Sequence, residues 1–182
     1  VLPSTVRANR TTCNLQLMEP LNMDRTMIVD VAPPEFRERA AFRVVGLSTR
    51  CTFETNFAIP NLWMEFVPRL PEIPQSVPDT TYGVCCDVEA DGHFRYVAGV
   101  ESRAERLPDG MDFVDIRAGR YAVFKHVGDL SDLRRTVYTI WNKALPDAGL
   151  EPAKAPDFEL YDKRFHPETG DGLVEIWIPI GR

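Results

Sequence analysis

The stretch from residue 129 to residue 145, DLSDLRRTVYTIWNKAL, has the strongest helical pattern in the chain. Its apolar side chains recur three and four residues apart, so they would form one stripe along a helix. The members of this stripe are Leu133, Val137, Ile140, Trp141 and Leu145. Gly149 follows shortly afterwards, as is typical beyond the end of a helix. We therefore predict an amphipathic helix that packs its apolar side against a sheet.

Strand-like segments surround this helix and place it in a repeated unit. A strand that ends at residues 121–124 precedes it, and residues 158–165 and 173–180 follow as a hairpin across a glycine-rich turn. The same order of strand, helix, strand and strand occurs earlier, at residues 42–52, 60–70, 82–88 and 94–100. An Asp-Gly pair marks the turn of that earlier hairpin.

The repeated order predicts an α+β fold of tandem duplicated strand-helix-strand-strand units, with pseudo-two-fold symmetry and a ligand cleft between the halves. Residues 41–182 would form this domain, with repeat one at about 41–104 and repeat two at about 111–182. Residues 1–40 contain four prolines and little periodicity, so we predict an irregular N-terminal extension without a helix-turn-helix. We expect the cleft on the sheet faces that the helices leave uncovered.

The composition is that of an ordinary globular protein, and it argues against several classes of partner. Of 182 residues, 44% are apolar and 26% are charged, with a formal net charge of -6. Both signs of charge are interleaved without a basic patch, so we expect no nucleic acid binding by the chain itself. The four cysteines lack the spacing of zinc ligands, and we expect no metal and no cofactor. No segment reaches the ~20 apolar residues of a membrane span, so we expect a cytoplasmic protein without a membrane partner.

Strand alternation sorts the side chains that would face the cleft. The two neighbours of Glu159 in the strand are expected to pack beneath the helix, which leaves Glu159 and Tyr161 on the opposite face. In the last strand, a continuous apolar row would fill the core and leave Glu175 and Trp177 on the opposite face as well. These four residues are therefore predicted to form one set of acids and aromatic rings.

An acid among aromatic rings suits a delocalised organic cation. Each ring can add ~0.5–2 kcal/mol of cation–π attraction, and a lipophilic cation would relieve the cost of a buried carboxylate. In the first unit, Tyr96 is a further aromatic candidate, and Gly83 would either leave room for a ligand or mark a bulge or close packing. The alternative is that Glu159 and Glu175 are ordinary polar positions on a solvent-facing strand.

Three segments of the second unit together resemble the GyrI-like effector-binding family, which includes the ligand-binding halves of AraC-type and MerR-type multidrug regulators. They are YAVFKHVG at 121–128 with Trp141 beyond it, FELYD at 158–162 and EIWIPI at 175–180, and the resemblance covers about residues 42–182. It implies the duplicated architecture, a ligand cleft between the repeats, and Glu159 as the counter-charge of cationic drugs. Tyr161 would neighbour that glutamate, with Trp141, Tyr96 and Trp177 as further aromatic candidates.

The chain departs from those regulators because it shows no recognisable DNA-binding domain, so it resembles a stand-alone binding module. We expect a binding protein rather than an enzyme. Some members of the family nevertheless hydrolyse strained electrophiles, for which Glu159 would act as general base and Tyr161 would steer the leaving group.

Further alternatives concern other ligands and partners. Haem binding would need an axial histidine over an apolar face, and none of His93, His126 and His166 is evidently placed for it. A protein-binding inhibitor module would use the charged edges or the extension. A homodimer or an unknown protein partner also stays open.

Overall fold

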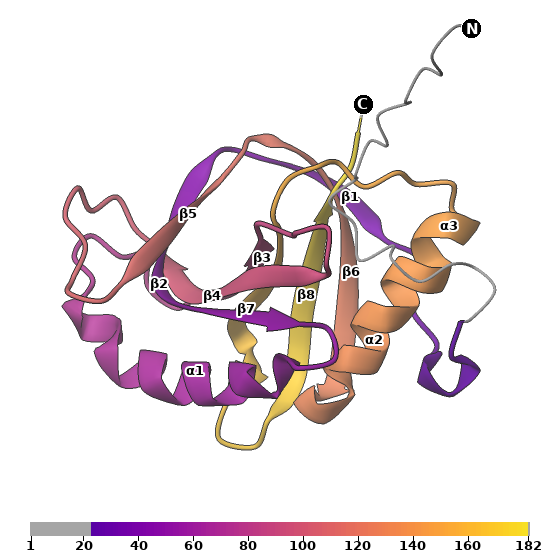
Figure 1. Cartoon of the computed structure of the whole chain (residues 1–182), viewed down its shortest axis with the longest axis horizontal. Helices are drawn as coiled ribbons and strands as arrows, with labels where there is room; N and C mark the ends of the chain where they lie inside the picture. The colour runs from indigo at the N-terminus through magenta and orange to yellow at the C-terminus, as the bar shows by residue number, and fades with distance from the viewer. Residues whose placement is uncertain (1–22, 182) are drawn as a thin grey trace, which may run out of the picture.

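The computed structural model describes residues 23–181, which form one eight-stranded antiparallel sheet with two helical segments (Figure 1). The order across the sheet is β1-β6-β8-β7-β3-β4-β2-β5. The strands are β1 (Glu35–Arg39), β2 (Phe42–Thr52), β3 (Thr81–Cys86), β4 (His93–Glu101), β5 (Asp112–Ile116), β6 (Gly119–Asp129), β7 (Asp157–His166) and β8 (Asp171–Pro179).

The two helical segments follow β2 and β6. The first is α1 (Ile59–Phe66), with the 3-10 turns η3 (Asn56–Ala58) before it and η4 (Val67–Glu72) after it. The second runs through η5 (Leu130–Asp132), α2 (Leu133–Thr139), the π-helical turn η6 (Ile140–Ala144) and α3 (Leu145–Asp147). A short 3-10 turn, η2 (Arg25–Met27), precedes β1. Both helices lie where the apolar spacing predicts them.

Both faces of the sheet are buried, and this decides where a ligand can bind. On the helix-bearing face, one cluster joins Phe66 of α1 to Tyr96, and another joins Trp141 to Phe124 and Ile176. The helix-free face has a third cluster made of strand residues alone. Its buried members are Val44, Tyr82, Val84, Cys86, Val97, Val114, Ile116, Tyr121, Val123, Phe158, Leu160 and Trp177.

The helix-free face fills itself because the sheet curls. The ring centroids of Phe42 on β2 and Phe158 on β7 lie 5.6 Å apart, although β4 and β3 stand between these strands in the sheet. A flat sheet with strands about 4.8 Å apart would keep them much further from each other. The curl therefore closes this face on its own side chains.

The structure agrees with much of the predicted pattern and differs in two places. β2 has the predicted bounds, and the two predicted hairpins are β3–β4 and β7–β8. Within the predicted irregular extension, residues 35–39 form β1, which pairs with β6. The single strand expected before the second helix is two strands, β5 and β6. Residues 1–22 of the predicted extension lie outside the described residues.

The predicted assignment of faces in β7 is wrong. Phe158 pairs with Trp177 and Glu159 pairs with Ile176, and directly paired residues share a face. Ile176 belongs to the cluster beneath the second helix, so Glu159 lies on the helix-bearing face. Phe158 lies on the helix-free face with Trp177. Because the curl buries both faces, hydrophobicity alone does not show which side of β7 meets the helices.

The described residues test only part of the predictions about cysteines, metal sites and membrane spans. Cys51, Cys85 and Cys86 are free thiols, and Cys13 lies outside the described residues. Residues 23–181 contain no group of three or more His, Cys, Asp and Glu side chains placed to hold a metal ion. No helix in this part of the chain is both long enough and apolar enough to span a membrane.

Candidate functional site

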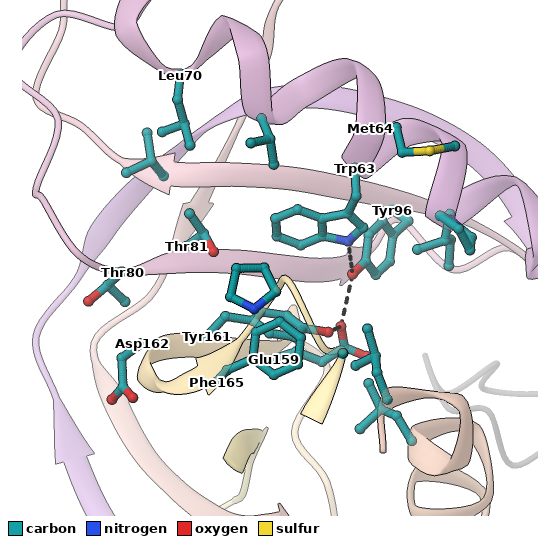
Figure 2. Close-up of a pocket in the computed structure, with 18 of the residues that line it drawn as sticks. Trp63, Met64, Leu70, Thr80, Thr81, Tyr96, Glu159, Tyr161, Asp162 and Phe165 are labelled. Atoms are coloured by element: carbon teal, nitrogen blue, oxygen red, sulfur yellow. Dashed lines mark hydrogen bonds between the residues drawn. The ribbon is translucent and has the colours of Figure 1, made fainter. Parts of the chain in front are cut away.

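A cavity of about 1170 Å³ lies on the helix-bearing face, between α1 and the start of α2 (Figure 2). Its floor is formed by β3, β4 and β7, and its walls are helix side chains and the loop before β3. Its lining includes Phe57, Trp63, Met64, Tyr96, Glu159, Tyr161 and Phe165. The expected cleft on the uncovered sheet faces is therefore replaced by a cavity between the two helices.

Glu159 is the acid at the floor of this cavity. Its Oε2 atom accepts hydrogen bonds from the hydroxyls of Tyr96 and Tyr161, each at 2.8 Å. Trp63 of α1 donates from Nε1 to the hydroxyl oxygen of Tyr96 at 3.1 Å. Within residues 23–181, no hydrogen bond reaches the other carboxylate oxygen, Oε1, and no basic side chain pairs with Glu159. A ligand in the cavity would therefore meet an unpaired carboxylate oxygen.

Gly83 on β3 makes this arrangement possible. A Cβ atom at this position would lie 1.9 Å from the Tyr96 hydroxyl oxygen and 2.6 Å from Oε2 of Glu159. Gly83 pairs directly with Glu159 in the sheet and so lies beneath the hydrogen bond between Tyr96 and Glu159. The sequence allows two interpretations of Gly83, room for a ligand or a bulge or close packing, and the structure shows close packing.

The pKa values of the titratable groups around Glu159 are shifted mainly by burial, and secondly by the negative potential of the Glu159 carboxylate. Burial raises the pKa of the Glu159 carboxyl, and the hydrogen bonds from the two tyrosines only partly oppose this. Burial and then the charge of Glu159 hold the pKa values of Tyr96 and Tyr161 well above the ordinary value of a phenol. The same two causes raise the pKa of the half-buried Asp157 to about 7. Positive charge in the cavity would relieve this potential.

Aromatic and aliphatic side chains form the walls around the acid. The Trp63 and Tyr161 rings meet edge to face at 5.2 Å, and Tyr161 meets Phe165 in the same way at 5.2 Å. At the opening, Phe57 and Met64 are 75% and 67% exposed, which is unusual for such apolar residues. The apolar surface therefore continues from the floor of the cavity out to solvent.

The structure brings together some of the predicted site residues and separates others. Glu159, Tyr161 and Tyr96 line the cavity, with Gly83 beneath them. Trp141, in η6, packs against β6 and β8 and is not among the residues that line the cavity. Glu175 and Trp177 lie on the helix-free face, so the predicted set of two acids and two aromatic residues is divided between the faces.

Three contributors were missed by the sequence reasoning. Trp63 lies within the helix predicted at 60–70, and its indole N–H takes part in the polar chain to Glu159. Phe165 also lines the cavity, and its even spacing from Glu159 and Tyr161 along the strand is the signal that could have placed it on the same face. Asp157 precedes Glu159 by two residues, and this i, i+2 spacing is the signal that could have placed it on the same face.

Comparisons with known proteins agree on the family. The model of the GyrI-like small molecule binding domain matches residues 32–181. Transcriptional regulator BrlR of Pseudomonas aeruginosa is 37% identical over 146 residues, which are 79% of this chain and 53% of BrlR. Probable transcriptional regulator YgiV of Escherichia coli K12 is 33% identical over 108 residues, which are 55% of this chain and 66% of YgiV. The chain thus spans only part of each of these relatives.

Solved structures show the same fold. SAV2435 bound to tetraphenylphosphonium superposes with a TM-score of 0.67 at 17% identity, covering 84% of this chain and 94% of that one. EcmrR in a complex with DNA superposes with a TM-score of 0.56 at 17% identity, covering 87% of this chain and 60% of that one. Because the family model matches most of this chain, the chain belongs to the GyrI-like small molecule binding domain family.

Proposed function

We propose that this chain binds lipophilic organic cations in the cavity between α1 and α2, with the Glu159 carboxylate as their counter-charge. The observation that carries the proposal is the state of that carboxylate. It lies within an aromatic cavity, accepts two phenol hydrogen bonds on one oxygen, and has no basic partner among the described residues. A buried charge without an opposite charge is costly, so a cation gains affinity that a neutral molecule does not.

The walls favour a bulky cation with delocalised or shielded charge. Aromatic faces attract such a cation, and its weak hydration means that few hydrogen bonds are needed to offset its desolvation. The volume of about 1170 Å³ lies above the usual range of small-molecule sites, about 300–1000 Å³, and so has room for a bulky ligand. The neighbour SAV2435, which has the same fold, is bound to tetraphenylphosphonium, a cation of this class.

We also infer that the cavity lies between two duplicated halves. On either side of the β3–β7 pairing the strand order is β3-β4-β2 and β7-β8-β6, and each half follows the sequence strand, helix, strand, strand. Each half then supplies one helical wall, and the floor takes β3 and β4 from the first half and β7 from the second. Because the relatives BrlR and YgiV are named as transcriptional regulators, the bound cation would serve as an effector.

A pair of isosteric ions of opposite charge tests the proposal. Tetraphenylphosphonium and tetraphenylborate have nearly the same shape and apolar surface, so calorimetric titration with each isolates the effect of charge. We expect micromolar affinity for the phosphonium and at least tenfold weaker binding of the borate, a difference of about 1.4 kcal/mol or more. Equal affinities, or tighter binding of the borate, would contradict a cation site.

A further inference from the structure

The helix-free face contains a second group of aromatic rings, and a guanidinium lies among them. The Cζ atom of Arg39 is 4.2 Å from the ring centroid of Phe42, 5.3 Å from Trp177, 5.5 Å from Tyr82 and 5.6 Å from Phe158. We call these four rings the aromatic box. Four rings within reach of one cation form an environment of the kind that binds organic cations in recognition sites.

The box also has polar groups suited to a planar cation. Nη2 of Arg39 donates to the hydroxyl oxygen of Tyr82 at 2.7 Å and lies 3.4 Å from Oε2 of Glu101. The Arg39 side chain is 22% exposed, so the box is open to solvent on one side. Apolar side chains alone would be enough to cover a core. The opening of the box instead combines an acid, a hydroxyl and four rings.

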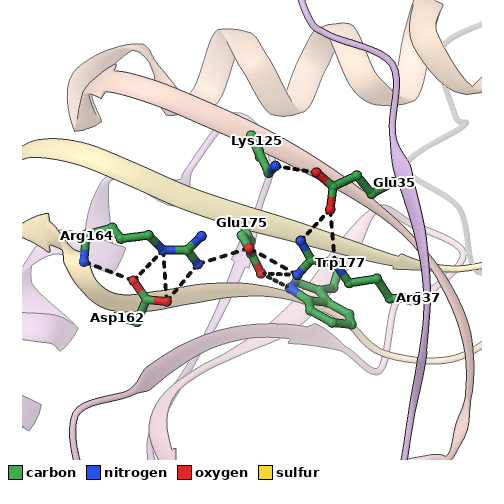
Figure 3. A network of polar contacts seen from close by, with 7 residues as sticks. All are labelled: Glu35, Arg37, Lys125, Asp162, Arg164, Glu175 and Trp177. Atoms are coloured by element: carbon green, nitrogen blue, oxygen red, sulfur yellow. Dashed lines mark hydrogen bonds and ion pairs between the residues drawn. The ribbon is translucent and has the colours of Figure 1, made fainter.

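The occupant of the box comes from a short edge strand. Alternation along β1 directs Arg37 and Arg39 to the same face of the sheet. Arg37 pairs with the buried Glu175 at 3.2 Å and lies 5.5 Å from the Trp177 ring, as Figure 3 shows for the ionic network around Glu175. β1 has only five residues, and among the described strands it pairs with β6 alone. Its two guanidinium groups therefore add contacts on this face to its pairing with β6.

We infer that the aromatic box is a second cation-binding site, selective for guanidinium-type cations, which the protein fills with its own Arg39. The attachment of β1 to the sheet then depends on Arg39 occupying the box. This site is independent of the cavity at Glu159, because the two lie on opposite faces of the sheet. Its ligand class also differs: the box surrounds one small planar cation, whereas the cavity has room for a bulky one.

Removal of the occupant and its replacement by a free ion tests the inference. Arg39→Ala should empty the box, and methylguanidinium at millimolar concentration should then bind there and raise the Tm of the variant with saturation. We expect it to recover at least half of the Tm lost through the substitution. Arg50→Ala is the matched control, because Arg50 is also a strand arginine but is 57% exposed and pairs with Glu89 at the surface. Neither this control nor the wild type should show saturable stabilisation, and methylammonium should replace methylguanidinium poorly.

A gentler variant keeps the test decisive if Arg39→Ala does not fold. Arg39→Gln retains part of the aliphatic stem and removes the guanidinium that lies over Phe42. The same saturable rise in Tm, accompanied by a change in tryptophan fluorescence from Trp177, is expected. Absence of saturable stabilisation in a folded Arg39 variant, or an equal effect on Arg50→Ala, would overturn the inference.

Discussion

The substitution Gly83→Ala examines how the acid of the cavity is held in place. The added Cβ atom would lie 1.9 Å from the hydroxyl oxygen of Tyr96 and 2.6 Å from Oε2 of Glu159, so the hydrogen bond between them cannot persist. A hydrogen bond to a charged group contributes about 1.5–3 kcal/mol, and replacement of a glycine by alanine returns about 0.4–1 kcal/mol through the unfolded state. We therefore expect a net loss of about 1–2 kcal/mol in the free energy of unfolding.

Urea unfolding at neutral pH measures this loss, and two further variants locate its origin. Gly119→Ala is the control, because a Cβ atom at that strand glycine meets nothing within 4 Å. It should leave stability unchanged or slightly improved. In a Tyr96→Phe background, Gly83→Ala should cost less, because the closest clashing atom is absent. If Gly83→Ala is as stable as the Gly119→Ala control, the role assigned to the hydrogen bond above Gly83 is refuted.

Three other predictions follow from the charges on both faces of the sheet. The pKa of Asp157 is raised from 3.8 to about 7, so its contribution to stability is present at acid pH and is lost as pH rises through 7. After a discount for partial exposure, Asp157→Asn should therefore stabilise the protein by about 2 kcal/mol more at pH 8 than at pH 4, as urea unfolding at both values would show. In the Asp157→Asn background, the affinity for tetraphenylphosphonium should fall as pH is lowered through the raised pKa of Glu159, because protonation removes the counter-charge. Calorimetric titrations at several pH values measure this, and an affinity that does not change with pH would contradict it. Glu175→Gln should lower the free energy of unfolding by about 2–3 kcal/mol, because Arg37, Arg164 and the indole of Trp177 all contact this 2% exposed carboxylate. A loss below 0.5 kcal/mol in urea unfolding, about that of a surface substitution, would argue against this network.

The order of elements could be predicted because each carries a local signal. The helix that begins after Asp129 has its apolar stripe, and the turns of both hairpins contain glycine. β1 has no such signal: its residues, EFRER, are four charged side chains and one exposed phenylalanine. Their place in the sheet is set by pairing with β6. Pairing between segments about 80 residues apart cannot be read from local periodicity.

The identity of the central acid could be predicted, but not the side on which it lies. Glu159 was singled out by its pattern and by the family resemblance, whereas its face depends on the register with Ile176 and on the curl that buries both faces. The same curl explains why Trp177 and Glu175, which alternate as expected, belong to a different site. Their neighbours are Arg37 and Arg39, residues of a strand that the pattern did not reveal.

The most direct test of the cation cavity is the affinity of Glu159→Gln for tetraphenylphosphonium at pH 8, measured by calorimetry beside Asp79→Asn. Asp79 lies at the exposed rim of the same cavity, so the control removes an equal charge from a position in contact with solvent. We expect Glu159→Gln to bind about tenfold to a hundredfold more weakly than the wild type, a loss of about 1.4–2.8 kcal/mol, and Asp79→Asn to change the affinity less than threefold. Equal binding by Glu159→Gln and the wild type would mean that the carboxylate at the floor of the cavity is not the counter-charge.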